Sequence, residues 1–297
     1  MKQTISSRPR PIPRPRPIPR PRLPQADEKI FDSQGEIPKK FWEYSQDPQT
    51  RVSLLITSYN TPREFLKECL ESIENQVGEF FLEILWVNDG STPSQTAVLE
   101  SMLKEMALLN NCSVVYHQFI ENRGLSYALR YGVEKCTNEL IFRLDSDDIM
   151  YRDRILRQLR FMQKTEDCML SGTNMFHFEM RGNKKKYLGT SDHPFRQTWE
   201  EYKKTKKTWI LNHPTLCFRK SAILSVGNYN EFLRLPFEDL DLELRVLKKY
   251  GVVYNIPNTL LMYRIHSNQI TKQNSLLKRD ERNNSLKRAF IEDITRD

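Results

Sequence analysis

The chain has 297 residues, of which 38% are apolar, and it carries a formal net charge of +8 at pH 7. This apolar fraction is enough for a sizeable core, and no apolar run approaches the roughly 20 residues of a membrane span, which argues against a transmembrane protein. The five cysteines are far apart and form no Cys-x-x-Cys pair, which argues against a zinc site and a disulfide framework. Together with the lack of a secretory signal, these features predict a cytoplasmic protein.

The first segment of the chain is a repetitive basic tail. Residues 8–24 read RPRPIPRPRPIPRPRLP. Because proline lacks an amide hydrogen and fixes φ, we expect this segment to be extended and solvated, and we predict a disordered tail over residues 1–36. Residues 1–22 hold Lys2 and six arginines, a charge of +7, so the rest of the chain carries only +1. The folded part is therefore not expected to bind nucleic acid specifically, whereas the tail is a candidate for peripheral contact with anionic membranes.

After the tail, strand-like segments alternate with helix-like segments. Short apolar runs bounded by turn residues predict strands at 51–57, 81–87, 113–118 and 139–144. Apolar residues at helical spacing predict helices at 62–76, 93–109, 125–136 and 152–165. This alternation predicts an α/β fold in which helices cover both faces of a mostly parallel central sheet.

Two later segments complete the predicted organisation. Residues 180–193 read MRGNKKKYLGTSDH, which is typical of a hairpin tip with a basic cluster at Lys184 to Lys186. Residues 272–297 are mostly polar with leucines at loose helical spacing, which indicates a helical segment or a tail. The folded domain is therefore predicted to span residues 37–271.

Polar residues follow three of the predicted strands. The first strand leads to Tyr59 and Asn60, the second to Asp89, and the fourth to a cluster that begins at Asp145. Each group alone could be an ordinary turn or helix cap. In sheets of this kind, however, ligands bind at the carboxyl ends of the strands, so the three groups are expected to meet on one rim.

The sequence DSDD after the fourth strand suggests a metal site. Carboxylates this close repel one another unless a cation, hydrogen-bond donors or a helix N-terminus receives them. With no cysteine or histidine beside them, Asp145 and Asp147 are predicted to bind a hard divalent cation such as Mg²⁺ or Mn²⁺, while Asp148 is expected to cap the next helix. The alternative is that all three cap a helix or contact water.

Seven motifs in order resemble those of the family 2 glycosyltransferases, over residues 51–271. They read SLLITSYN, ILWVNDGST, ENRGLSYALRYGVEKC, LIFRLDSDD, HPTLCFRKSAILSVGNYNE, PFEDLDLELRV and YRIHSNQIT. The resemblance implies a GT-A fold. It also implies an inverting, metal-dependent transfer of a sugar from a nucleotide-sugar, expected to be a UDP-sugar, to a hydroxyl of a glycan, lipid-linked or protein acceptor.

The resemblance also implies roles for individual residues. It implies that the nucleotide-sugar lies at Thr57, Tyr59, Asn60, Asp89, Asn122, Gly124, Arg130 and Asp145. It implies that Mn²⁺ or Mg²⁺ is bound by Asp145, Asp147 and His266. It implies that Glu238 and Asp239 supply the general base, although acidic residues at a helix start also complement the helix dipole. His213 is expected to be structural or to face the acceptor.

Two other functions fit parts of the sequence. A nucleotidyltransferase uses a related fold and paired aspartates, but its first strand leads into a glycine-rich phosphate loop, and here the sequence is TSYNTPREFL. A non-catalytic scaffold that acts through the basic tail is the second alternative. An enzyme that had lost its activity would be expected to lose its carboxylates, and these are present.

Overall fold

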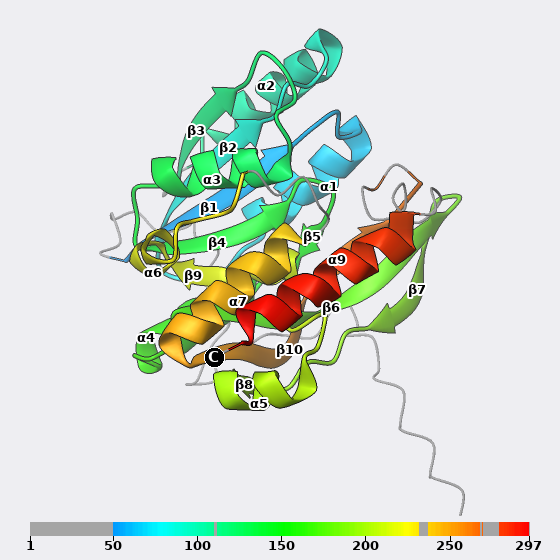
Figure 1. The fold of residues 1–297 in the computed structure, drawn as a ribbon. Helices are drawn as coiled ribbons and strands as arrows, with labels where there is room; N and C mark the ends of the chain where they lie inside the picture. Colours follow the sequence, from blue (N-terminus) through cyan, green and yellow to red (C-terminus); the bar gives the residue numbers. More distant parts are fainter. Residues whose placement is uncertain (1–49, 110–111, 232–236, 268, 270–278, 297) are drawn as a thin grey trace, which may run out of the picture. The chain divides into compact units, whose positions relative to one another are not determined.

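The computed structural model describes residues 50–109, 112–231, 237–267, 269 and 279–296 (Figure 1). The strands are β1 (Arg51–Ser58), β2 (Phe81–Asn88), β3 (Cys112–Gln118), β4 (Leu140–Asp145), β5 (Ile149–Met150), β6 (Leu170–Arg181), β7 (Lys184–Thr190), β8 (Arg196–Thr198), β9 (Cys217–Arg219) and β10 (Val252–Ile265). The helices are α1 (Arg63–Glu74), α2 (Pro93–Met106), α3 (Leu125–Lys135), α4 (Arg154–Lys164), α5 (Trp199–Thr205), α6 (Lys220–Ser225), α7 (Glu238–Tyr250), α9 (Arg279–Ile294) and the short 3₁₀ helix η2 (His213–Thr215).

The predicted alternation of strands and helices is confirmed from β1 to α4. The largest difference is at the end of α2, which was expected to reach residue 109 and ends at Met106. The predicted hairpin is also present, because β6 and β7 pair antiparallel around a turn in which Gly182 has a φ of 56°. The predicted tail over residues 1–36 lies outside the described residues.

The strands form one 10-stranded sheet. Eight of them follow the order β3-β2-β1-β4-β9-β6-β10-β5, and the other two, β7 and β8, pair with β6 and β10, respectively. The pairs β1–β2, β1–β4, β2–β3 and β6–β10 are parallel. The antiparallel pairs involve β7 and the short strands β5, β8 and β9. The prediction of a mostly parallel sheet is therefore confirmed for the long strands, and antiparallel strands extend it.

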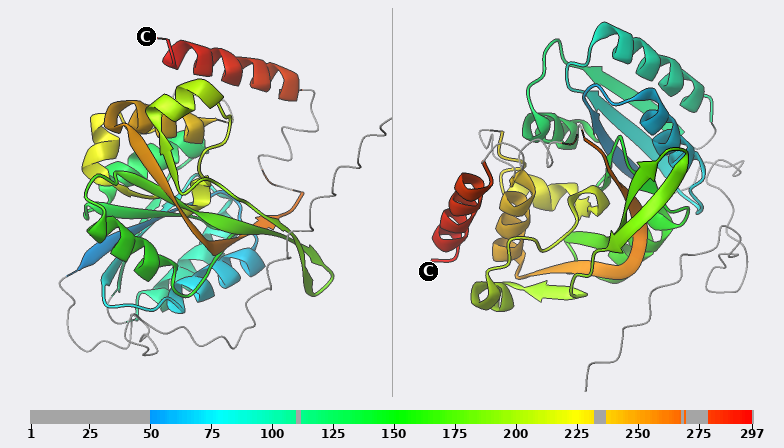
Figure 2. Two further views of the ribbon diagram at one scale, coloured as in Figure 1. Left: turned by 90° about the horizontal axis from the view of Figure 1, so that it is seen from below. Right: turned by 90° about the vertical axis from the view of Figure 1, so that its right-hand side faces the viewer.

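Helices cover both faces of this sheet. Successive side chains of a strand point to opposite sides, so a single strand contributes to the apolar core on each face. In β1, Leu54 and Ile56 pack in the apolar core that includes residues of α1, α2 and α4. Leu55 packs in the other core, with residues of α3 and α7. Figure 2 (left) shows α7 in orange and α9 in red on one side of the sheet, with α4 in green and α1 in blue on the other. The contact of α3 with β1 is close, since a Cβ on Gly132 would lie 2.2 Å from Cδ1 of Leu55.

The C-terminal helix α9 packs against α7. Ile291 is only 2% exposed, and the Phe290 ring lies 5.6 Å from the ring of Phe237, the residue before α7. Lys248 of α7 also donates a hydrogen bond to the Ile294 carbonyl at 2.8 Å. The helix therefore covers apolar side chains near the start of α7.

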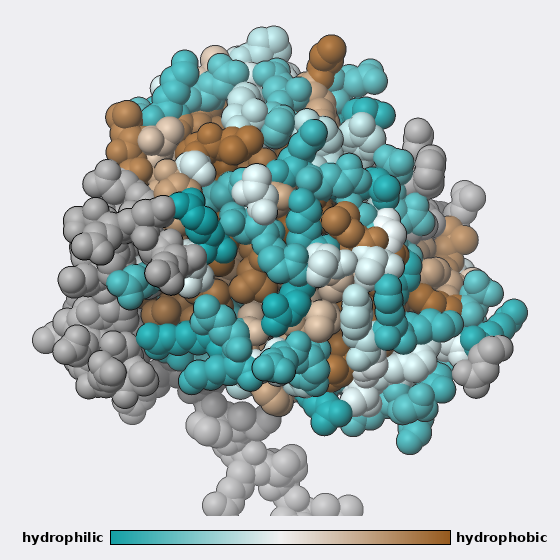
Figure 3. Space-filling view, turned by 90° about the vertical axis from the view of Figure 1, so that its left-hand side faces the viewer, coloured by the Kyte–Doolittle hydropathy of each residue, from teal (hydrophilic) through white to brown (hydrophobic). Residues whose placement is uncertain are grey.

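None of the helices in the described residues is both long and apolar enough to cross a membrane. On the face drawn in Figure 3, hydrophilic side chains in teal separate smaller hydrophobic patches in brown. The hydrophobic side chains are concentrated in the two cores on either side of the sheet.

Candidate active site

The ends of β1, β2 and β4 lie side by side on one rim of the sheet. The strand register pairs Thr57 with Asp145 and Ser58 with Asn88. The backbone N–H of Asp89 then donates to the Ser58 carbonyl at 2.8 Å, which continues the pairing beyond the strands. The rim that the sequence predicted is thus formed by adjacent strands.

Asn60 connects the segments that follow β1 and β2. Its side-chain Oδ1 accepts a hydrogen bond from the Thr92 N–H at 2.9 Å, and its own N–H donates to Ser91 Oγ at 2.9 Å. Its φ of 51° lies in the left-handed region, which asparagine tolerates better than most residues. The preceding side chain, Tyr59, is left 53% exposed on the rim.

Asp89 organises the loop before α3. Its carboxylate accepts hydrogen bonds from the Arg123 N–H at 2.8 Å, the Gly124 N–H at 2.9 Å and Asn122 Nδ2 at 3.0 Å. Burial raises the pKa of Asp89, and the two backbone donors oppose this shift. Gly90 allows the close approach, because a Cβ there would lie 2.3 Å from the Glu121 carbonyl carbon. The structure therefore brings Asp89, Asn122 and Gly124 together.

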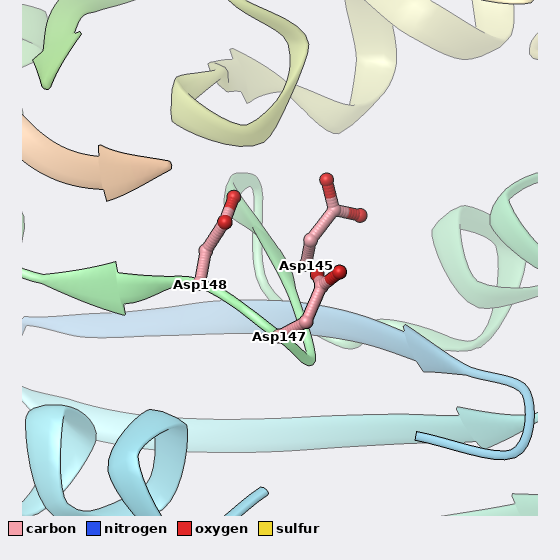
Figure 4. A group of neighbouring side chains, drawn as sticks. All are labelled: Asp145, Asp147 and Asp148. Atoms are coloured by element: carbon pink, nitrogen blue, oxygen red, sulfur yellow. The ribbon is translucent and has the colours of Figure 1, made fainter. Parts of the chain in front are cut away.

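The carboxylates of Asp145, Asp147 and Asp148 converge at the end of β4. One oxygen from each lies within 4.8 Å of the others (Figure 4). Asp147 Oδ2 lies 2.9 Å from His266 Nε2, so the structure brings the histidine to the cluster. The predicted metal ligands therefore meet, although they come from β4, the turn after it and the segment after β10.

Arg143 forms a two-pronged ion pair with Asp145. Its Nη1 donates to Asp145 Oδ2 at 2.7 Å, and its Nη2 contacts Oδ1. The two residues alternate with Leu144 in β4 and so share a face of the sheet. Burial raises the pKa of Asp145, and the positive charge of Arg143 opposes this shift.

Asp148 does not cap α4, contrary to the expectation from the sequence. Its Oδ1 accepts a hydrogen bond from the Arg264 N–H of β10 at 2.9 Å, and the residue at the start of α4 is Asp153. Asp148 is fully buried, and its Oδ2 has no hydrogen-bond partner among the described residues. Burial raises its pKa well above the ordinary value, and the charges of Asp147 and Asp145 add to the shift.

These features fit a hard divalent cation. Three carboxylates supply the oxygen ligands that Mg²⁺ and Mn²⁺ prefer, and a buried oxygen of Asp148 is without a donor. A cation there would also relieve the repulsion among the three groups.

Glu238 and Asp239 begin α7, and both are half-buried. Burial raises the pKa of Glu238 to about 8, and the negative charge of Asp239 adds to this shift. The positive charge of Arg143 lowers this pKa and the negative charge of Asp145 raises it further. The pKa of Glu238 therefore responds to charged groups at the end of β4.

Arg130 and His213 make contacts with the segment before α7. Arg130 Nη1 donates to the carbonyls of Gly227 at 3.0 Å and Tyr229 at 3.1 Å. His213 Nε2 lies 2.9 Å from the Tyr229 hydroxyl, and burial lowers the pKa of this histidine well below its ordinary value. These contacts favour a structural role for His213 over contact with the acceptor. The Arg130 guanidinium is hydrogen-bonded to backbone carbonyls.

Sequence reasoning missed two buried arginines at the site, Arg143 and Arg264. The signal for Arg143 was available, because a residue two positions before Asp145 in a strand must lie on the same face. Arg264 gave no comparable signal, since its partner Asp148 is 116 positions away in the chain.

Comparison with known sequences identifies the family. The sequence model of the family described as "Glycosyl transferase family 2" matches residues 53–226. The amylovoran biosynthesis glycosyltransferase AmsE of Erwinia amylovora is 31% identical over 223 residues, which cover 74% of this chain and 79% of that protein. An Escherichia coli protein, UDP-Gal:alpha-D-GlcNAc-diphosphoundecaprenol beta-1,3-galactosyltransferase, is 31% identical over 206 residues, which cover 68% of this chain and 69% of that protein.

Solved structures show the same fold. The mannosyltransferase PcManGT from Pyrobaculum calidifontis, in complex with GDP-Man and Mn²⁺, has a TM-score of 0.56 at 15% identity, covering 77% of this chain and 62% of that one. TarS of S. aureus has a TM-score of 0.54 at 16% identity, covering 73% of this chain and 37% of that one. The chain therefore spans less than two thirds of the length of each of these two proteins. The chain belongs to glycosyl transferase family 2 and is a glycosyltransferase with the GT-A fold.

Proposed function

We propose that this protein transfers a sugar, with inversion, from a UDP-sugar to a hydroxyl group, in a reaction that depends on Mn²⁺ or Mg²⁺. The observation that carries the proposal is the convergence of the carboxylates of Asp145, Asp147 and Asp148 at the end of β4. A nucleotide-sugar needs stabilisation of its leaving diphosphate, and the acceptor hydroxyl needs a base. The aspartate cluster supplies groups for the first task, and the carboxylates that begin α7 are proposed for the second.

The donor is proposed to bind along the ends of β1 and β2. The exposed Tyr59 ring is available to stack on a nucleotide base, with Thr57 and Asn60 beside it. The loop of Asn122 and Gly124, held by Asp89, forms the adjoining wall. The E. coli relative uses UDP-Gal, and one structure of TarS contains UDP-GlcNAc, which supports a UDP-sugar as the donor.

The metal is proposed to be held by Asp145, Asp147 and His266. A divalent cation bound there would offset the negative charge that develops on the leaving diphosphate. Arg143 keeps the Asp145 carboxylate fixed, and the Asp148 oxygen without a donor gives a third acidic group on the same side. The complex of PcManGT with GDP-Man and Mn²⁺ supports Mn²⁺ as the first cation to test.

The general base is proposed to be Asp239. A carboxyl whose pKa is about 8 is mainly protonated at pH 7, so Glu238 is suited to donate a hydrogen bond at that pH. Asp239 then takes the proton of the acceptor hydroxyl as its oxygen attacks the anomeric carbon and the nucleoside diphosphate leaves. One displacement on one face inverts the anomeric configuration.

The acceptor is proposed to be a hydroxyl of a glycan, lipid-linked saccharide or protein. The E. coli relative acts on a saccharide linked to diphosphoundecaprenol, which favours a lipid-linked saccharide. Contact of the basic tail with anionic membranes would bring the enzyme to such an acceptor, and it remains a prediction about residues outside those described.

A donor-hydrolysis screen tests the proposal. The purified protein is incubated with UDP-, GDP- and TDP-sugars and Mn²⁺, and release of the nucleoside diphosphate is measured with and without EDTA. We expect release from a UDP-sugar that EDTA abolishes and Mn²⁺ restores. Equal release in EDTA would refute the metal dependence, and release from GDP-sugars alone would refute the choice of donor.

A further inference from the structure

Arg264 of β10 touches the aspartate turn at two points. Its backbone N–H donates to Asp148 Oδ1 at 2.9 Å, and its Nε donates to the Asp147 carbonyl at 2.8 Å. The residue is only 1% exposed, and it lies two positions before His266. The Arg264 side chain thus holds the backbone of one proposed metal ligand, Asp147, and the residue stands two positions before another, His266.

The guanidinium of Arg264 is itself held on three sides. Its centre lies 4.3 Å from the ring centroid of Phe65 in α1 and 4.8 Å from that of Phe178 in β6. Its Nη2 forms an ion pair with Glu68 of α1. Contacts of this kind restrict an arginine to one rotamer, so its Nε keeps a fixed direction toward the aspartate turn.

Glu68 extends this set of contacts to the protruding hairpin. Its other oxygen, Oε1, lies 2.7 Å from Lys185 Nζ in β7. Figure 2 (left) shows the β6–β7 hairpin reaching beyond the rest of the sheet. Lys185, Glu68 and Arg264 therefore form a continuous series of ion pairs from the hairpin to the backbone of Asp147.

We propose that Arg264, held in place by Glu68, is a positioning residue that sets the aspartate turn in the geometry needed to bind the divalent cation. The proposal rests on the proposed function, since it concerns the same metal. Arg264 is not a ligand, because a guanidinium has no lone pair to offer. It acts as groups beyond the ligands do at other metal sites, where losing one costs about 10- to 100-fold in metal affinity or activity.

The test measures Mn²⁺ binding to the full-length protein without donor, by electron paramagnetic resonance of the free ion. Glu68→Gln keeps the shape of the side chain and removes the charge that holds Arg264, and Arg264→Lys keeps a charge but cannot donate in the same directions. Glu71→Gln is the matched control, since Glu71 lies on the same helix and its partner is the exposed Lys67 at 3.7 Å. We expect affinity to fall about 10-fold in the first two variants and to stay unchanged in the control.

A purely structural role would give a different result. In that case Glu68→Gln would lower the thermal midpoint, and the folded fraction would bind Mn²⁺ with wild-type affinity. Wild-type affinity in Glu68→Gln therefore overturns the inference, and this variant decides the matter if Arg264→Lys does not fold. A further variant, Asp147→Asn, distinguishes failure of the proposed metal site from failure of the positioning role of Arg264.

If Asp147→Asn loses Mn²⁺ binding while Glu68→Gln and Arg264→Lys keep it, the inference fails and the proposed metal site stands. If the wild-type protein binds no Mn²⁺, the proposed metal site fails and the inference fails with it. Turnover adds a second readout, because weaker metal binding should be overcome by higher Mn²⁺ concentration, whereas loss of a group that takes part in the chemistry should not.

Discussion

Replacing Arg143 by methionine is expected to destabilise the protein strongly. Arg143 is buried, with 2% of its side chain exposed, and it pairs through two nitrogens with Asp145. Removing one partner of a buried ion pair typically costs about 3–5 kcal/mol, because the other charge is left without compensation. The Asp145 side chain is 25% exposed and can gain some hydration, so we expect a loss at the low end, about 3 kcal/mol.

Urea denaturation in EDTA at pH 7.5 measures this loss. Arg181→Met is the control, because the Arg181 side chain is 66% exposed and an ion pair open to water, such as the one it forms with Glu179, contributes little to stability. The double variant Arg143→Met/Asp145→Asn should recover much of the stability, since it removes the uncompensated charge. The reasoning is refuted if Arg143→Met costs no more than the control, or if the double variant is as unstable as the single one.

Four further outcomes are expected. Asp147→Asn should abolish metal-dependent donor turnover while the thermal midpoint holds, since it relieves repulsion among crowded carboxylates; wild-type turnover with Mn²⁺ would contradict its assignment. Asp239→Asn should lower turnover at least about 100-fold with little change in UDP affinity by calorimetry, and equal loss of UDP binding would make it a donor-site residue. The raised pKa of Glu238 means that the folded state keeps a proton that the unfolded state loses, so the free energy of unfolding should fall as the pH rises from 4.5 toward about 8. In urea denaturation, Glu238→Gln should lose less of its free energy of unfolding over this pH range than the wild-type protein. Deleting residues 1–24 should leave donor hydrolysis unchanged but reduce sedimentation with anionic liposomes at low salt, and crippled turnover would place the tail in the active site.

The sequence was sufficient to predict the strands that build the rim. The apolar runs of β1, β2 and β4 are long, bounded by turn residues and separated by amphipathic helices. The local sequence pattern therefore predicts the same strands that the central sheet contains. The polar residues that leave these strands could be placed together by the rule for parallel sheets alone. That rule explains why Asp145 and Asp89 were predicted on one edge.

What the sequence could not supply were contacts between distant segments. Strands β5, β8 and β9 have only two or three residues, too few for a periodic pattern, so the antiparallel extension of the sheet was not predicted. Asp148 was assigned to a helix cap because local spacing favours that partner, whereas its donor lies in β10. Glu68 and Arg264 are 196 positions apart, and no local signal links them.

The loops of the rim are held together by hydrogen bonds in which the donors are backbone N–H groups. Asn60 receives the backbone N–H of Thr92, and Asp89 receives those of Arg123 and Gly124. Every residue except proline has such an N–H, so the framework does not depend on which side chains stand at positions 92 and 123. Those side chains are therefore free to change during evolution or in directed engineering, and new sugar donors could be accommodated while the loops keep their places.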